Sequence, residues 1–88
     1  MNEEMLALQE ELITLIDSKK FQELKRILSE INPADIALFL EELEEKDLPV
    51  VFRILPKELA AETFVEMDPE AQELLIRGFS DNELREVL

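Results

Sequence analysis

Residues 32–72 read NPADIALFLEELEEKDLPVVFRILPKELAAETFVEMDPEAQ, and this stretch decides the fold because the same helix-start signal occurs in it twice. Asn32-Pro33 and Asp68-Pro69 each place a capping side chain directly before a proline. Asn and Asp accept a hydrogen bond from the first turn of a helix, and proline is tolerated there because its missing N–H has no intrahelical partner. We therefore expect helices to begin at Pro33 and at Pro69.

The apolar residues of the whole chain recur with a period near 3.6, which predicts amphipathic helices. Helices restart near residues 33, 45, 56, 69 and 80, about a dozen residues apart, and helices this short stack one after another into a superhelix. The fold class is therefore all-α, with about seven short helices. The residues expected to face the core are Met5, Leu8, Leu12, Leu15, Ile16, Phe21, Leu24, Ile27, Leu28, Ile31, Ile36, Phe39, Leu40, Leu43, Leu48, Val51, Phe52, Leu55, Ala60, Phe64, Met67, Ala71, Leu74 and Leu75.

Three helix boundaries depend on single polar residues or glycine. Asp17 and Ser18 interrupt the first apolar stripe, and we expect them to cap the second helix. Gly78, the one glycine, is expected to end the sixth helix in a left-handed conformation. Ser80 and Glu83 then form a capping box that opens a seventh helix.

Composition limits both the class of protein and its partners. With 88 residues the chain (residues 1–88) is expected to form a single domain, and the apolar end of its last predicted helix suggests the N-terminal part of a longer protein. The net charge is −13, and no cluster of Lys and Arg is present to bind phosphates. Nucleic acid and anionic lipid are thus excluded as expected ligands, and a cation or a basic protein surface is favoured.

The sequence gives no support for catalysis. It has no His and no Cys, so the commonest general base and the commonest metal ligands are missing. It contains no Gly-rich phosphate loop, and its start lacks the basic and apolar regions of a signal peptide. No apolar run reaches the length of a membrane span, so we expect a soluble, cytoplasmic, non-enzymatic domain that does not insert into a membrane.

Acidic side chains are placed unusually on the fifth predicted helix. Glu58, Glu62 and Glu66 are spaced i, i+4 and i+8, which puts three like charges on one ridge and destabilises the helix by about 0.2–0.5 kcal/mol per pair. A Mg²⁺ ion shared with a second acidic surface would relieve this repulsion, and a solvated face is the alternative. The run of Glu41, Glu42, Glu44 and Glu45 is interpreted as a solvated turn.

Three blocks of sequence carry a resemblance to a known family. Residues 32–37 read NPADIA, residues 51–62 read VFRILPKELAAE, and residues 67–72 read MDPEAQ. In this order and spacing they resemble the cytosolic N-terminal domain of MgtE-type magnesium transporters. The resemblance implies a right-handed superhelix of short helices, followed in the full-length protein by a pair of CBS domains and a transmembrane pore domain in a homodimer.

The resemblance also implies a function and a site. The family domain lies on the cytoplasmic side of the bacterial cell membrane and senses magnesium. Mg²⁺ ions bridge it to the CBS domains and favour a closed pore. Glu62 matches the family position that contributes to an interdomain Mg²⁺ site, and Glu58 and Glu66 are further candidates. The alternative is a non-catalytic interaction module like the helical domains of the flagellar motor switch protein FliG, which would bind a protein without metal.

Overall fold

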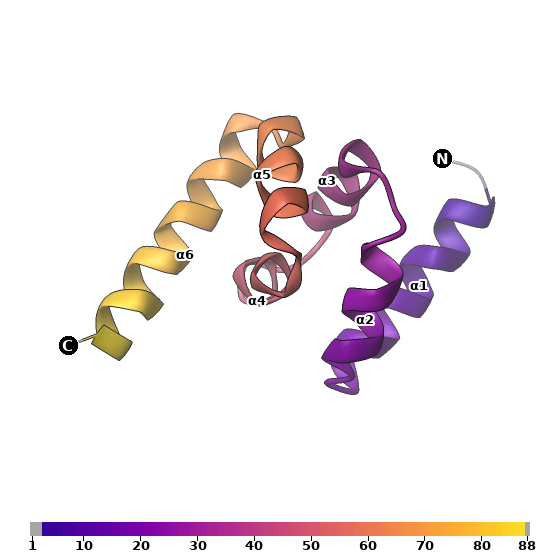
Figure 1. The fold of residues 1–88 in the computed structure, drawn as a ribbon, viewed down its shortest axis with the longest axis horizontal. Coiled ribbons are helices and arrows are strands. Elements are labelled where there is room, and N and C mark those ends of the chain that lie inside the picture. Colours follow the sequence, from indigo (N-terminus) through magenta and orange to yellow (C-terminus); the bar gives the residue numbers. More distant parts are fainter. Residues whose placement is uncertain (1–2, 88) are drawn as a thin grey trace.

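The computed structural model confirms the all-α class. It describes the backbone of residues 3–87 and the side chains of residues 3, 4 and 6–78. Over the described backbone the chain forms six helices joined by short links, and no strand is present (Figure 1). The helices are α1 (Glu3–Asp17), α2 (Phe21–Leu28), α3 (Pro33–Glu41), α4 (Leu48–Ile54), α5 (Lys57–Glu66) and α6 (Pro69–Val87).

The helices are packed mainly against near neighbours in the sequence, as a stacked helical array requires. α1 pairs with α2 in a hairpin at one end, while α3, α4 and α5 form the middle and α6 lies at the other end (Figure 1). The most extensive contact joins α3 to α5, and α4 packs on both α3 and α6. The molecule is accordingly elongated, with extents of 43 × 28 × 23 Å.

The core is built from the predicted apolar stripes. Leu24, Leu28, Ile36, Leu40 and Val51 are fully inaccessible to solvent and link the hairpin to the middle helices. The predicted positions around them are buried or partly buried, with Met5 outside the described side chains. α4 and α5 are further joined by an edge-to-face contact between the rings of Phe52 and Phe64. The ring centroids lie 6.3 Å apart, and the ring planes are inclined at 69° to each other.

Both proline-containing helix starts are confirmed. Asn32 Oδ1 accepts a hydrogen bond from the Asp35 N–H at 3.0 Å, and Asn32 Nδ2 donates to Asp35 Oδ2 at 3.0 Å. Asp68 Oδ1 accepts from the Ala71 N–H at 3.0 Å. Pro33 and Pro69 are the first residues of α3 and α6, so these two motifs set both the start and the direction of their helices.

The prediction that Asp17 and Ser18 cap α2 is wrong. The N-cap of α2 is Lys20, which makes no side-chain capping hydrogen bond. The connection is made by the backbone at the end of α1, where the Lys20 N–H donates to the Leu15 carbonyl and the Lys19 N–H donates to the Ile16 carbonyl. This is a Schellman motif, and Lys19 takes the left-handed conformation in it with φ 59°.

The predicted break at Gly78 and the seventh helix are also wrong. α6 continues from Pro69 to Val87 without interruption, and Gly78 has no positive φ. A Cβ atom built on Gly78 would lie 2.5 Å from Cγ of Pro49, so the glycine allows α6 to approach α4 closely within a continuous helix. The side chains of Ser80 and Glu83, expected to form a capping box, lie outside the described residues.

None of the described helices is both long enough and apolar enough to cross a membrane. α6 is the longest at 19 residues, but polar and charged residues occur along it.

Candidate functional site

α5 is the helix that positions the predicted glutamates. It begins after Pro56 and ends at Glu66. Its inner face packs on the core through Thr63, which is fully buried, and through the partly buried Leu59, Ala60 and Phe64. This packing fixes the rotation of the helix, so the ridge with spacing i, i+4, i+8 is held on the outside.

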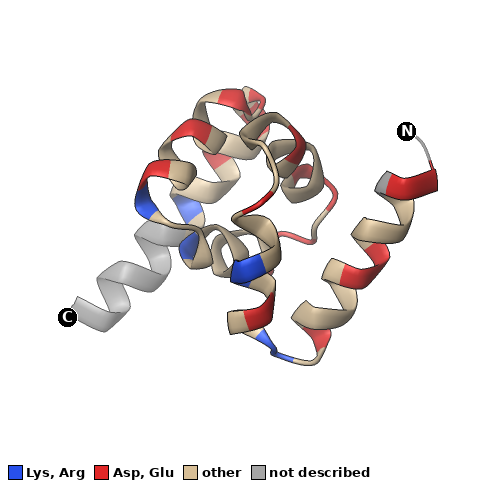
Figure 2. Ribbon diagram, turned by 45° about the vertical axis from the view of Figure 1, so that its right-hand side comes forward, with Lys and Arg blue, Asp and Glu red and all other residues tan. Residues whose placement is uncertain are grey.

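The three ridge glutamates are exposed, as the ridge hypothesis requires. Glu58, Glu62 and Glu66 all face solvent, and none of them takes part in an ion pair within the described part of the chain. Acidic positions outnumber basic ones over the helices (Figure 2). The charge of the ridge is thus left for solvent or for a ligand. The ion pairs of the described side chains lie elsewhere and join Arg26 to Glu23, Lys46 to Glu44, and Arg77 to Glu73.

Two of the three glutamates line a common groove. Glu62 and Glu66 border a cavity of about 390 Å³ together with Val65 from the same helix. The opposite wall is the start of α3, from Asn32 to Ala34. Glu58 does not line this groove, so the structure separates one end of the predicted ridge from the other two members.

The ridge does not form a complete metal site within the described residues, where no group of three or more potential ligands is placed to hold an ion. Glutamates one turn apart are separated by about 6 Å along the helix axis. Two oxygens bound to the same Mg²⁺ lie within about 4 Å of each other. A Mg²⁺ ion bound to one ridge glutamate would therefore take its other oxygen ligands from water or from a second surface. Glu62 is exposed and can be reached by both.

A second acidic pair was missed in the sequence. Glu41, the last residue of α3, forms a side-chain hydrogen bond with Asp68, the N-cap of α6, and this contact raises the pKa of Glu41 to about 7. The same hydrogen bond lowers the pKa of Asp68, and the hydrogen bond that Asp68 accepts from the Ala71 N–H lowers it further, by a smaller amount. The proton of the pair is therefore held mainly by Glu41 below about pH 7, while Asp68 keeps its charge. Glu41 is exposed, as are Glu42, Glu44 and Glu45, so the interpretation of this run as solvated holds, but it missed the contact of Glu41 with Asp68.

No local pattern could have revealed this pair, because its members lie far apart in the sequence. The cap-then-proline signal identified Asp68 as a capping residue, but it carried no information about which side chain approaches it. Thr63 was missed for a related reason. It occupies a buried position of α5, and its hydroxyl has no hydrogen-bond partner among the described residues.

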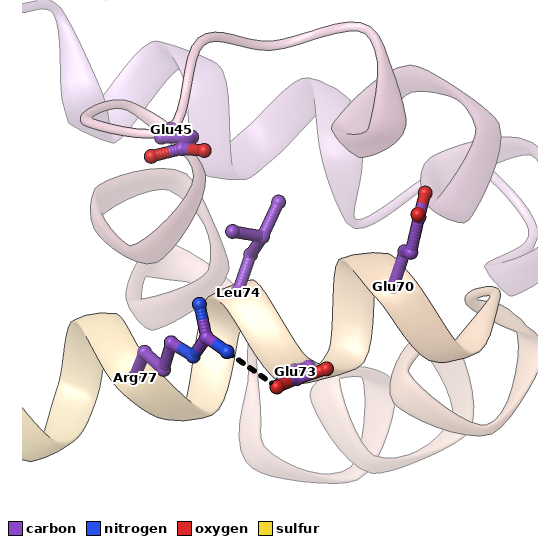
Figure 3. Close-up of a pocket in the computed structure, with 5 residues that line it drawn as sticks. All are labelled: Glu45, Glu70, Glu73, Leu74 and Arg77. Carbon is purple, nitrogen blue, oxygen red and sulfur yellow. Dashed lines mark hydrogen bonds and ion pairs between the residues drawn. The ribbon is translucent and has the colours of Figure 1, made fainter.

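Another open cavity of about 380 Å³ lies between α6 and the segment that joins α3 to α4 (Figure 3). Glu45 comes from that segment, while Glu70, Glu73, Leu74 and Arg77 come from α6. Arg77 Nη2 lies 2.6 Å from Glu73 Oε1, so the one basic group among the described lining residues is paired. These five described lining residues include no Ser, Thr, Cys or His that could act as a nucleophile or as a neutral base.

Comparison with known proteins agrees with the resemblance seen in the motifs. The family model described as the MgtE intracellular N domain matches residues 31–88. No curated protein and no solved structure matches the chain. The match includes all three resembling sequence blocks and covers more than half of the chain, from the residue before the α3 N-cap onward. The chain therefore belongs to the MgtE intracellular N domain family.

Proposed function

We propose that this domain senses magnesium on the cytoplasmic side of a bacterial membrane and regulates a magnesium transporter. Its role is non-catalytic: it docks on CBS domains of the same full-length protein, with Mg²⁺ bridging the two surfaces, and the docked state favours a closed pore. The full-length protein acts as a homodimer. Membership of the MgtE family supports the link to magnesium transport and favours it over the interaction-module alternative.

The observation that carries the proposal is that Glu62 is exposed and forms no ion pair with any side chain that the structure describes. A hard cation such as Mg²⁺ prefers carboxylate and water oxygens and takes only one or two protein carboxylates at many sites. Glu62 offers one such oxygen donor at the outer face of α5, next to the groove. Glu58 and Glu66 flank it by one turn on each side and strengthen the local negative potential.

The gating mechanism follows from charge. A domain with a net charge of −13 is repelled by another acidic surface, so the separated arrangement is favoured at low Mg²⁺. Ions that bind between the two surfaces stabilise only the docked arrangement, and they shift the population toward it. The size of the shift is set by the difference in Mg²⁺ affinity between the two arrangements.

The test uses the full-length protein with its CBS domains. We expect Mg²⁺ at millimolar concentration to make the cytosolic part more resistant to protease, and Glu62→Gln to require more Mg²⁺ for the same protection. Glu10→Gln removes the same charge from an exposed position of α1 and serves as the matched control. Equal Mg²⁺ dependence for wild type and Glu62→Gln would refute the role of Glu62, and no protection at all would refute magnesium-driven docking.

A further inference from the structure

The groove beside Glu62 contains an aliphatic side chain that the magnesium role does not use. Val65 is 77% exposed, the highest value among the large apolar residues that the structure describes as exposed. It lies in α5 between Glu62 and Glu66 and faces a wall formed by Pro33 and Ala34. The groove therefore combines an apolar surface with two carboxylates at its edge.

The residues of this groove are poorly suited to a surface that contacts only water. Valine is a β-branched residue with a lower helix propensity than the longer polar residues common on helix surfaces. Glu66 is the last residue of α5, where the negative end of the helix dipole disfavours an anion. Single exposed apolar residues are common, but this one is in a concavity whose two carboxylates have no ion-pair partner among the described side chains.

We propose that this groove binds a helical segment of a partner protein that carries two Lys or Arg residues one turn apart and an aliphatic residue on the same face. The charges are complementary, because the described lining of the groove includes two glutamates and no basic residue. Glu62 and Glu66 are about 6 Å apart along their helix, which equals the rise between positions i and i+4 of a partner helix. The aliphatic residue of the partner would then contact Val65, in the manner of a helix docked in a groove.

This inference goes beyond magnesium sensing, because the contact needs no metal ion. The two roles share Glu62, whereas Val65 has no oxygen that could bind Mg²⁺. A buffer without free Mg²⁺ therefore separates them: a substitution at Val65 should weaken peptide binding there, where no metal can contribute. A substitution at Glu62 should affect both roles.

The experiment measures binding of a dye-labelled, alanine-based helical peptide of about 15 residues to the 88-residue chain by fluorescence anisotropy. The peptide carries two lysines four positions apart and one leucine on the same face. The buffer contains a chelator, so a failure of magnesium sensing cannot alter the result. One control peptide has alanine in place of leucine, and another has glutamine in place of both lysines.

We expect saturable binding of the complete peptide and weaker binding of both controls. Val65→Ser should weaken binding about tenfold, as expected for loss of one buried valine contact. Glu62→Gln should weaken it about threefold, as for a surface ion pair. Ile76→Ser is the matched control, because Ile76 is 54% exposed on α6 and does not line the groove.

Circular dichroism of each variant establishes that it is folded before binding is compared. Saturable binding that Val65→Ser weakens and Ile76→Ser does not would support the groove as the docking surface. Non-saturable binding of the complete peptide, equal binding of wild type and Val65→Ser, or an equal loss in Ile76→Ser would each overturn the proposal.

Discussion

Substituting Gly78→Ala tests whether α6 is a continuous helix packed on α4. In an isolated helix this change would stabilise the structure by about 1 kcal/mol, because alanine has the highest helix propensity. Here the added methyl carbon would lie 2.5 Å from Cγ of Pro49. Carbon atoms in good contact are about 3.5–4.0 Å apart, so the overlap is about 1 Å or more. Pro49 is buried, and its ring has little freedom to move away.

Overpacking of this kind costs about 1–3 kcal/mol, and an overlap with a stiff, buried ring belongs in the upper part of that range. After the gain in helix propensity, we expect Gly78→Ala to lower the free energy of unfolding by about 1–2 kcal/mol. The measurement is urea denaturation of the 88-residue chain followed by far-ultraviolet circular dichroism.

A double-mutant cycle with Pro49→Ala isolates the contact. Once the proline ring is removed, only the gain in helix propensity remains, so Gly78→Ala should stabilise the chain by about 1 kcal/mol, which would give a coupling energy of about 2–3 kcal/mol. If Gly78→Ala instead stabilises the chain by about 1 kcal/mol with or without Pro49, then the close approach of α6 to α4 is absent and our explanation of the glycine is refuted.

Two other substitutions test local features of the structure by the same denaturation measurement. Lys19→Gly should stabilise the chain by about 1 kcal/mol, because Lys19 has φ 59° and glycine adopts this conformation without steric cost; unchanged or lower stability would contradict it. The folded-state pKa of Glu41 is raised from 4.5 to about 7, so between these pH values the folded chain holds more protons than the unfolded chain, and stability contributed by the pair falls as the pH rises. Glu41→Gln should remove this part of the pH dependence, although solvent screening at these exposed carboxyls limits its size; an unchanged slope between pH 4.5 and 7 would refute the shared proton.

The elements that were predicted correctly are those whose signals are local. Asn32-Pro33 and Asp68-Pro69 place a cap and a proline side by side, and the hydrogen bonds that result span three residues. The apolar stripes likewise depend on periodicity within one helix. Both kinds of signal are complete before any tertiary contact forms, so the sequence was sufficient to place them.

The errors occurred where a tertiary or backbone contact decides the role of a residue. Glycine favours a helix end when it takes a left-handed conformation, but Gly78 allows the close approach of Pro49, which lies in α4 and is separated from α6 by the whole of α5. The end of α1 is formed by Lys19, a residue type that sequence statistics do not favour for a left-handed position. The same limit applies to the site, since periodicity predicted the glutamate ridge but could not show that Glu62 and Glu66 share a groove with Val65.

The acidic surface contributes little to holding this fold together, and this separates binding from stability at Glu62. The core is apolar, and the described ion pairs join exposed side chains close in sequence, where each contributes at most about 1 kcal/mol. Glu62 has a like-charged neighbour at both i−4 and i+4, and neither repulsion is relieved by an ion pair within the described residues. Glu62→Gln should thus raise the free energy of unfolding by about 0.4–1 kcal/mol at low ionic strength, and added salt should remove the gain. A variant that is more stable but needs more Mg²⁺ for protection would show that this charge is retained for binding; a variant that is less stable would mean that Glu62 supports the fold itself.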